Sequence, residues 1–158
     1  MNIVLVNPQI PQNTGSISRT CAATGTKLCL VGKLGFDISD KSVKRAGLDY
    51  WDYVEVKKYD TWDDYVTQNK NSKIWLFSKY GETIFWDAKF SEGDSLVFGS
   101  ETKGLGKELI SKYPKEQVLK LPMSCKYVRC LNLSNTASIA LYEALRQIRN
   151  QNDNKLEL

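Results

Sequence analysis

Histidine is absent from the 158 residues of this chain. Its absence excludes a catalytic dyad or triad that uses imidazole as the base, because histidine is the side chain that titrates near neutral pH. Histidine is also the commonest ligand of transition metals in proteins, so that ligand is missing as well. The sequence therefore predicts no metal site.

Cysteine is scarce: the four cysteines are Cys21, Cys29, Cys125 and Cys130, and no two of them have the C-x-x-C spacing of metal ligands or redox motifs. Small secreted domains that depend on disulfides carry cysteine at higher density. We expect four free thiols.

Long apolar runs are also missing. No window approaches the roughly 18 consecutive apolar residues that a membrane span needs. The apolar run that begins at Asn2 has no basic segment before it and is too short for a signal peptide, so it indicates a first strand. We expect a cytoplasmic protein that does not bind membranes. The net charge of +4 is compatible with a polyanionic partner but does not identify one.

The length and composition are those of one globular domain. A chain of 158 residues, 42% hydrophobic and 25% charged, can bury a core without disulfides or metals. We expect a single domain over residues 1–150 and a polar, frayed tail over 151–158.

Short apolar runs rich in β-branched residues alternate with helical patterns along the chain, which is typical of an α/β fold with a mainly parallel sheet covered by helices. The first helix is expected to be capped by Asn13 or Thr14 and to end at Gly25. Strands are predicted at 2–6, 27–31, 53–56, 74–78, 95–98 and 117–121, and further helices at 41–46, 61–69 and 107–113.

The last helix shows the clearest pattern. Ser134 or Asn135 is expected to cap it, and apolar residues recur on one face. The opposite side, with Ile139, Ala140 and Tyr142, is partly apolar as well. This helix can therefore be a core helix or can pack against a second subunit.

A glycine-rich segment, 99–106, follows the apolar strand at 95–98 and suits close approach of the backbone to a ligand. It fits neither the phosphate-binding loop, because Leu105 and Gly106 stand where Lys and Ser or Thr are needed, nor the dinucleotide pattern, because Leu109 replaces its third glycine. The alternative without a ligand is a loop with a glycine that caps a helix.

Two other segments have the composition of binding loops. The connection 121–135 is long and partly apolar, so it can wrap an adenosyl group or can simply pack on the core. Arg19 lies about one and a half turns into the first helix, where ligands bind in open α/β sheets. It can hold a phosphate through two hydrogen bonds or can be an ordinary solvated arginine.

Together these segments resemble the three motifs of the SPOUT methyltransferases, in particular the branch of minimal tRNA 2'-O-methyltransferases that act on the wobble nucleotide. The resemblance covers nearly the whole chain. It rests chiefly on Phe-Gly-Ser-Glu-Thr-Lys-Gly-Leu at 98–105, on Asn-Leu-Ser-Asn at 132–135 and on Leu-Tyr-Glu-Ala-Leu-Arg-Gln at 141–147.

The resemblance implies a C-terminal deep trefoil knot, a homodimer with composite active sites, and S-adenosylmethionine as methyl donor, with S-adenosylhomocysteine as product. The implied substrate is the wobble cytidine or uridine in the anticodon stem-loop of leucine tRNA. In the position where Cys130 stands, the family usually has serine, whose hydroxyl is a stronger hydrogen-bond donor than a thiol.

The resemblance also implies a set of site residues. The catalytic residues would be Arg19, Glu101 and Asn132. The cofactor would contact Phe77, Gly99, Leu121, Met123, Cys130 and Leu131. RNA would be bound by Lys41, Lys44, Arg45, Tyr50 and Arg129, because cations follow phosphates and aromatic faces stack on exposed bases.

A guanidinium group has a pKa above about 12 and is not a base at neutral pH. We therefore expect Arg19 to hold the adjacent phosphate and to polarise the 2'-hydroxyl, while phosphate or solvent receives the proton. The alternative function is an α/β protein that binds RNA or a nucleotide without catalysis. The presence of Arg19, Glu101 and Asn132 together argues against it.

Overall fold

The computed structural model describes residues 1–38, 51–125, 127–128 and 130–152. Its centre is a seven-stranded sheet with the order β3-β2-β1-β6-β4-β7-β5, and every neighbouring pair is parallel. The prediction of an α/β fold with a mainly parallel sheet is confirmed. The strands are β1 (Asn2–Val6), β2 (Lys27–Val31), β3 (Val56–Tyr59), β4 (Ile74–Phe77), β5 (Thr83–Ile84), β6 (Ser95–Phe98) and β7 (Val118–Lys120).

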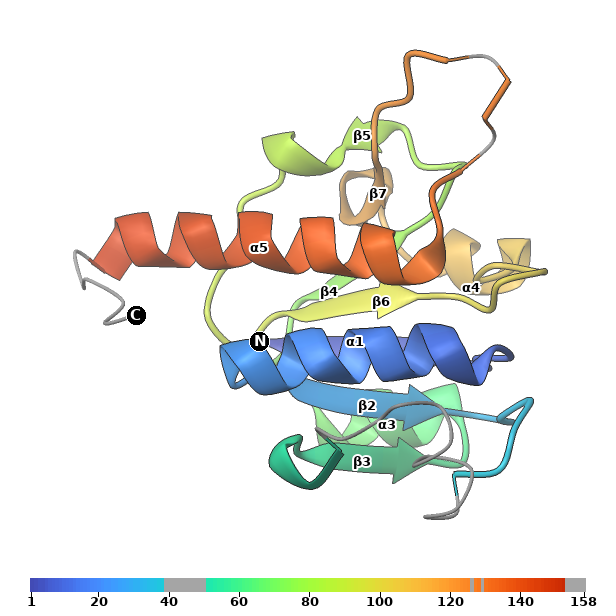
Figure 1. Cartoon of the computed structure of the whole chain (residues 1–158). Coiled ribbons are helices and arrows are strands. Elements are labelled where there is room, and N and C mark those ends of the chain that lie inside the picture. Colours follow the sequence, from blue (N-terminus) through green and yellow to red (C-terminus); the bar gives the residue numbers. More distant parts are fainter. Residues whose placement is uncertain (39–50, 126, 129, 153–158) are drawn as a thin grey trace.

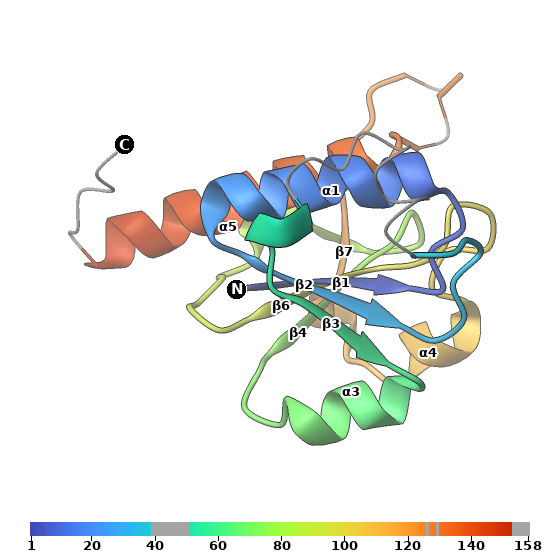
Figure 2. The ribbon, with the colours of Figure 1, turned by 60° about the horizontal axis from the view of Figure 1, so that its bottom comes forward.

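Helices cover both faces of this sheet. The helices α1 (Pro11–Thr24) and α5 (Leu133–Asn152) lie side by side on one face (Figure 1), where the hydroxyls of Thr20 and Ser138 are 3.1 Å apart. On the other face lies α3 (Trp62–Gln68), as Figure 2 shows, and α4 (Lys107–Ser111) follows the loop after β6. Short 3-10 turns occur at Trp51–Tyr53, Phe85–Asp87 and Lys115–Gln117.

Each face of the sheet has its own apolar core, because successive side chains of a strand point to opposite faces. In β1, Ile3 and Leu5 pack under α1 and α5, whereas Val4 and Val6 pack on the side of α3. The inner face of α5 contributes Ala137, Ala140, Leu141 and Ala144 to the first core. The interpretation of α5 as a core helix therefore holds for its inner face. Ile139 and Tyr142, on its outer side, remain exposed.

The third strand was predicted at 53–56 but spans Val56–Tyr59. Trp51–Tyr53 forms a 3-10 turn instead, and the strand pairs with β2 from Val56 opposite Leu28 to Tyr59 opposite Val31. The prediction failed because Lys57 and Lys58 look unlike a buried strand. In the sheet order β3 is an edge strand, where exposed lysines are common.

Two helix starts were predicted too late. Helix α1 begins at Pro11, without a side-chain cap, and Asn13 and Thr14 are buried inside its first turn. Proline suits this place because its fixed φ is helical and its missing N–H has no partner there anyway. Helix α5 begins at Leu133, and the Asn132 side chain accepts a hydrogen bond of 2.8 Å from the backbone N–H of Ser134. The cap is therefore Asn132 rather than Ser134 or Asn135.

Other expectations are met in part. Gly25 ends α1 with a φ of 62°, as predicted. Helix α4 stops at Ser111, short of the predicted 113, and α5 continues to Asn152, into the segment expected to be a frayed tail. The predicted helix at 41–46 lies outside the described residues. Within the described ranges, no helix is long and apolar enough to span a membrane.

The positions of the four cysteines lead to a first prediction. Cys21 and Cys29 are buried, and burial raises the pKa of Cys21 to about 12 and that of Cys29 to about 11. Cys125 and Cys130 are exposed. Since the thiolate is the reactive form, Ellman's reagent should label two thiols in the native protein at pH 8 and all four in denaturant. Rapid labelling of a third thiol without denaturant would contradict this burial.

Candidate functional site

A pocket of about 730 Å³ opens where β4, β6 and β7 end. Ligands in open α/β sheets bind outside the carboxyl ends of the strands, so this is the expected place for a site. Its floor is apolar: the rings of Phe77 and Phe98 stack with their centres 4.8 Å apart, and Leu119 is buried beside them. The walls are the two segments that the sequence singled out, the loop 99–106 and the connection between β7 and α5.

These two segments leave the same edge of the sheet, as Figure 1 shows, although they are far apart in the sequence. The pocket size lies within the range of roughly 300–1,000 Å³ that is typical of small-molecule sites. An apolar floor with loop backbone around it suits a ligand that is partly aromatic and partly polar. The arrangement therefore fits an adenosyl group.

The loop 99–106 depends on Gly99. A Cβ atom at this position would lie 2.0 Å from the carbonyl carbon of Gly104 and 2.1 Å from the nitrogen of Leu105. The backbone of the loop folds back at this point, where the N–H of Gly104 donates a hydrogen bond of 2.8 Å to the carbonyl of Ser100. Gly99 is therefore required for the shape of this wall, whether or not a ligand touches it.

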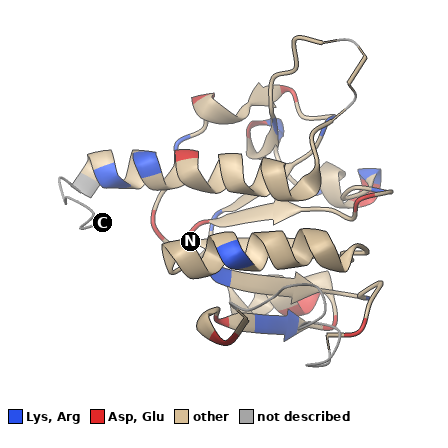
Figure 3. Ribbon diagram, viewed as in Figure 1, with Lys and Arg blue, Asp and Glu red and all other residues tan. Residues whose placement is uncertain are grey.

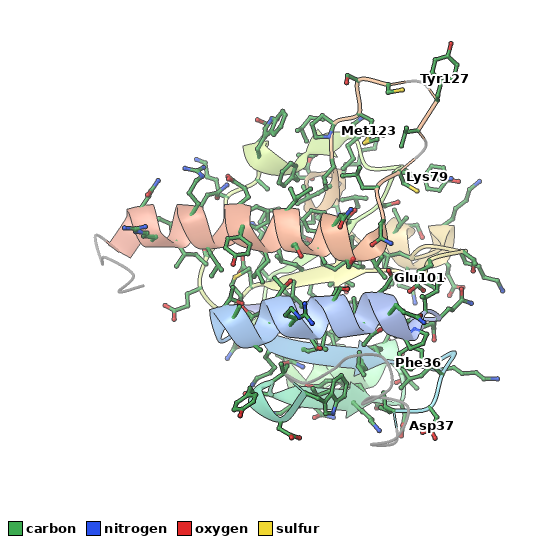
Figure 4. All side chains as sticks on the ribbon, viewed as in Figure 1. Phe36, Asp37, Lys79, Glu101, Met123 and Tyr127 are labelled. Atoms are coloured by element: carbon green, nitrogen blue, oxygen red, sulfur yellow. The ribbon has the colours of Figure 1, made fainter. Side chains whose placement is uncertain are left out.

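The carboxylate of Glu101 is held by the beginning of α1 (Figure 4). It accepts hydrogen bonds from the backbone N–H groups of Gln9, at 2.8 Å, and Ile10, at 3.2 Å, and from the side-chain amide of Asn13, at 3.0 Å. Backbone N–H groups at a helix N-terminus lack partners within the helix, and a negative charge is favoured there. Glu101 thus joins the pocket wall to α1.

Asn13 is a site residue that sequence reasoning missed, because it was interpreted only as a helix cap. Its side chain is almost fully buried and connects two predicted catalytic residues. The amide donates to Glu101, and its oxygen accepts a hydrogen bond of 3.0 Å from the side-chain amide of Asn132. Its position in the predicted first helix, six residues before Arg19, was the available signal.

The structure brings most of the predicted site residues together. The pocket is lined by all six predicted cofactor contacts and by two of the three predicted catalytic residues, namely Phe77, Gly99, Leu121, Met123, Cys130, Leu131, Glu101 and Asn132. The RNA-binding residues Lys41, Lys44, Arg45, Tyr50 and Arg129 lie outside the described residues. The roles of all these residues stay predictions.

Arg19 lies apart from this set. It is exposed on α1, six residues after Asn13, which corresponds to about 9 Å along the helix axis. Asn13 and Ile10 line the pocket but Arg19 does not. In the single chain the pocket is therefore formed without Arg19.

The charge around the pocket is mainly positive. The lining includes Lys79, Lys103 and Lys120, and in the described part of the chain none of these lysines forms an ion pair. The one carboxylate in the lining, that of Glu101, is engaged by three donors. The opening should therefore attract anions. Among the described residues no group of three or more His, Cys, Asp or Glu side chains could hold a metal ion.

Comparison with known proteins shows that the chain is similar to RNA methyltransferases. Residues 1–142 match the sequence profile described as the SpoU rRNA Methylase family. A tRNA (cytidine(34)-2'-O)-methyltransferase of Saccharophagus degradans is 44% identical over 147 residues, covering 93% of this chain and 95% of that protein.

Solved structures of RNA methyltransferases are similar to this chain as well. A structure described as giving insight into 2'-OH methylation of C/U34 on tRNA superimposes with a TM-score of 0.85 at 41% identity, covering 92% of this chain and 94% of the other. The SpoU methyltransferase AviRb of Streptomyces viridochromogenes, in complex with its cofactor AdoMet, has a TM-score of 0.76 at 25% identity, covering 93% of this chain and 60% of the other.

The contacts of Glu101 generate a second prediction. In Glu101→Gln one of the two accepting carboxylate oxygens is replaced by an NH2 group, which cannot accept. At least one of the three hydrogen bonds that Glu101 accepts is therefore lost. We expect the free energy of unfolding to fall by about 1–3 kcal/mol, measured by urea denaturation. The control is Glu108→Gln, because Glu108 is 91% exposed and its one ion-pair partner among the described residues, Lys112, is as far away as 3.9 Å. Equal stability of the two variants would contradict the anchoring role.

Proposed function

The chain belongs to the SpoU rRNA Methylase family, and on this basis we propose that it methylates the ribose 2'-hydroxyl of the wobble nucleotide of tRNA with S-adenosylmethionine as donor. The observation that carries the proposal is the near full-length similarity to a cytidine(34) 2'-O-methyltransferase, together with the pocket between the loop 99–106 and the connection to α5. The proposed substrate is cytidine or uridine 34 in the anticodon stem-loop of leucine tRNA. The leucine specificity rests on the resemblance alone.

The cofactor fits the residues that are present. When bound, S-adenosylmethionine supplies a methyl group on a positively charged sulfur. Phe77, Leu121 and Leu131 would pack on the adenosyl part, and loop backbone around Gly99 and Cys130 would provide hydrogen bonds. A relative with 25% identity has been crystallised with AdoMet, and this supports the assignment.

The transfer requires alignment and an acceptor for one proton. With donor and RNA bound, the ribose oxygen would form the new C–O bond as the sulfur–methyl bond breaks, and the hydroxyl proton would pass to a phosphate oxygen or to solvent. Arg19 would hold the neighbouring phosphate and polarise the hydroxyl. Glu101 and Asn132 would act through Asn13, by holding the start of α1 and the pocket wall in place.

A homodimer would explain the position of Arg19. Helix α1 carries one charged residue, Arg19 itself, and α5 carries none between Leu133 and Tyr142, so the two neighbouring helices present a surface with little charge (Figure 3). Ile139 is 42% and Tyr142 58% exposed on this surface. We propose that a second copy of the chain covers it and that Arg19 of one protomer completes the pocket of its partner.

The remaining features follow from the same proposal. The connection from β7 into α5 would be the threaded part of a C-terminal deep trefoil knot. The protein would act in the cytoplasm as a single domain over residues 1–150. Mass mapping of bulk tRNA after incubation with the protein and S-adenosylmethionine tests the activity. One added methyl group on the ribose of nucleotide 34 is expected, whereas cofactor binding without transfer would indicate a non-catalytic binder.

The third prediction concerns the guanidinium group of Arg19. Arg19→Ala should lower kcat on the order of a hundredfold, the typical effect of losing a group that stabilises the transition state. Arg19→Lys should recover little, because an ammonium group cannot form two parallel hydrogen bonds to phosphate. Arg149→Ala is the control, since Arg149 is exposed in the last turn of α5. Full turnover by Arg19→Ala would remove the assignment.

The composite site can be tested separately from Arg19 itself. Cys130→Trp should fill the pocket and abolish methylation. Co-expression of Arg19→Ala with Cys130→Trp yields a mixed dimer in which one of the two sites is intact, so activity should reappear. If each protomer used its own Arg19, the mixed dimer would stay inactive.

The cysteine in the pocket wall gives the fifth prediction. Cys130→Ser should tighten S-adenosylmethionine binding by about two- to fivefold, because a hydroxyl donates a better hydrogen bond than a thiol. Titration calorimetry measures the change. Cys125→Ser is the matched control, as Cys125 is exposed but does not line the pocket. Identical affinities for the two variants would mean that only the backbone at residue 130 is used.

A further inference from the structure

The turn after β4 forms part of the pocket opening and is firmly attached to the sheet. The N–H of Ser78 donates to the carbonyl of Leu119 at 2.9 Å, and the N–H of Gly81 donates to the carbonyl of Ser78 at 3.0 Å. A Cβ atom on Gly81 would lie 2.7 Å from the Leu119 carbonyl carbon, so the turn packs directly on the backbone of β7. Residues 79 and 80 are therefore presented from a rigid support.

Lys79 and Tyr80 are the two residues at the tip of this turn, and both line the pocket. The Lys79 ammonium lies over the Tyr80 ring, 5.0 Å from its centre, while 63% of Tyr80 remains exposed. One face of the ring thus carries a cation, while most of the side chain is open to solvent. Figure 4 shows Lys79 on the same side of the molecule as Met123.

Among the exposed aromatic side chains of the described residues, Tyr80 is the one that lines the pocket. Tyr80 belongs to neither apolar core, and its hydroxyl forms no hydrogen bond in the described part of the chain. Its backbone N–H contacts the Ser78 hydroxyl at 3.2 Å, so the turn does not need the ring. A structural role does not account for an aromatic residue here.

We propose that Lys79 and Tyr80 bind one nucleotide of single-stranded RNA next to the nucleotide whose ribose enters the pocket. The open face of Tyr80 stacks on the base, and Lys79 contacts the adjoining phosphate. Lys103 and Lys120 continue the positive rim along which the RNA backbone runs. This inference rests on the proposed function and adds the residues that position the substrate.

The chemistry favours RNA in a loop over duplex RNA. A base can stack on an aromatic side chain only where it is not already stacked in a helix, and sequence-specific RNA recognition mostly targets such loops. Stacking tolerates any base because each has a π face, so this contact sets the position of the RNA rather than its sequence. The anticodon loop provides unpaired neighbours on both sides of nucleotide 34.

The test compares RNA binding with cofactor binding in the same variants. Tyr80→Ala should weaken binding of an anticodon stem-loop RNA on the order of tenfold and raise KM with little change in kcat. Tyr80→Phe should behave as wild type, because the ring is kept. Lys79→Gln should reduce the slope of log affinity against log salt by about 0.7, the value for one phosphate contact with single-stranded nucleic acid. S-adenosylmethionine affinity should be unchanged in all three variants.

Two matched controls come from the chain itself. Lys73 stands before the opposite end of β4 and also lies over an aromatic ring, 4.2 Å from the centre of Trp75, so Lys73→Gln should leave the salt slope unchanged. Trp86 is 56% exposed but does not line the pocket, and Trp86→Ala should bind the stem-loop normally. A duplex RNA of the same length should not distinguish Tyr80→Ala from wild type.

The outcomes separate this inference from the proposed function. If wild type methylates the stem-loop and Tyr80→Ala binds it equally well, the inference is wrong and the function stands. Loss of cofactor affinity in Tyr80→Ala would also overturn it, since Tyr80 would then belong to the cofactor site. If wild type neither binds nor methylates the stem-loop, both proposals fail.

Discussion

The hydrogen bonds of Glu101 join parts of the chain that are far apart in the sequence and meet at one end of the sheet. They tie the loop after β6 to the beginning of α1, and Asn13 extends the connection to Asn132, where α5 starts. The two loop walls of the pocket and the first turn of α1 are therefore held in one arrangement. Because Glu101 and Asn132 use their side chains in this way, their predicted importance does not require either of them to touch the reacting atoms.

The paired helices α1 and α5 serve two purposes. Their inner faces bury Ile17, Ala140 and Leu141 against the sheet. The outer surface of α1 and of α5 as far as Tyr142 carries little charge, and Ile139 and Tyr142 are exposed on it. The proposed dimer would use the outer faces, and this same surface contains Arg19. The proposed catalytic role of Arg19, which lies outside the pocket of its own chain, is a difficulty for a monomer but is the expected arrangement when two copies share their sites.

Charge is distributed in a way that the net value of +4 does not reveal. Several lysines elsewhere are paired with carboxylates, such as Lys27 with Glu55 and Lys115 with Glu82, both at close distance. The three lysines at the pocket opening have no such partner in the described residues, and the carboxylate among them is already engaged. The pocket opening is therefore a place where a polyanion is attracted, and it is where the ribose would have to enter.

The sequence by itself determined the fold class and most of the strands, because burial on both sides of a parallel sheet leaves short apolar runs that local patterns reveal. It misplaced β3, whose lysines Lys57 and Lys58 hide an edge strand, and it put the start of α1 at Asn13 and Thr14, which are buried inside the helix. The family motifs pointed to Glu101 and Asn132, yet not to Asn13 between them. Only the tertiary structure decided that connection, because its hydrogen bonds join residues 88 and 119 positions apart. Such contacts depend on how the elements pack in space, and no local periodicity records them.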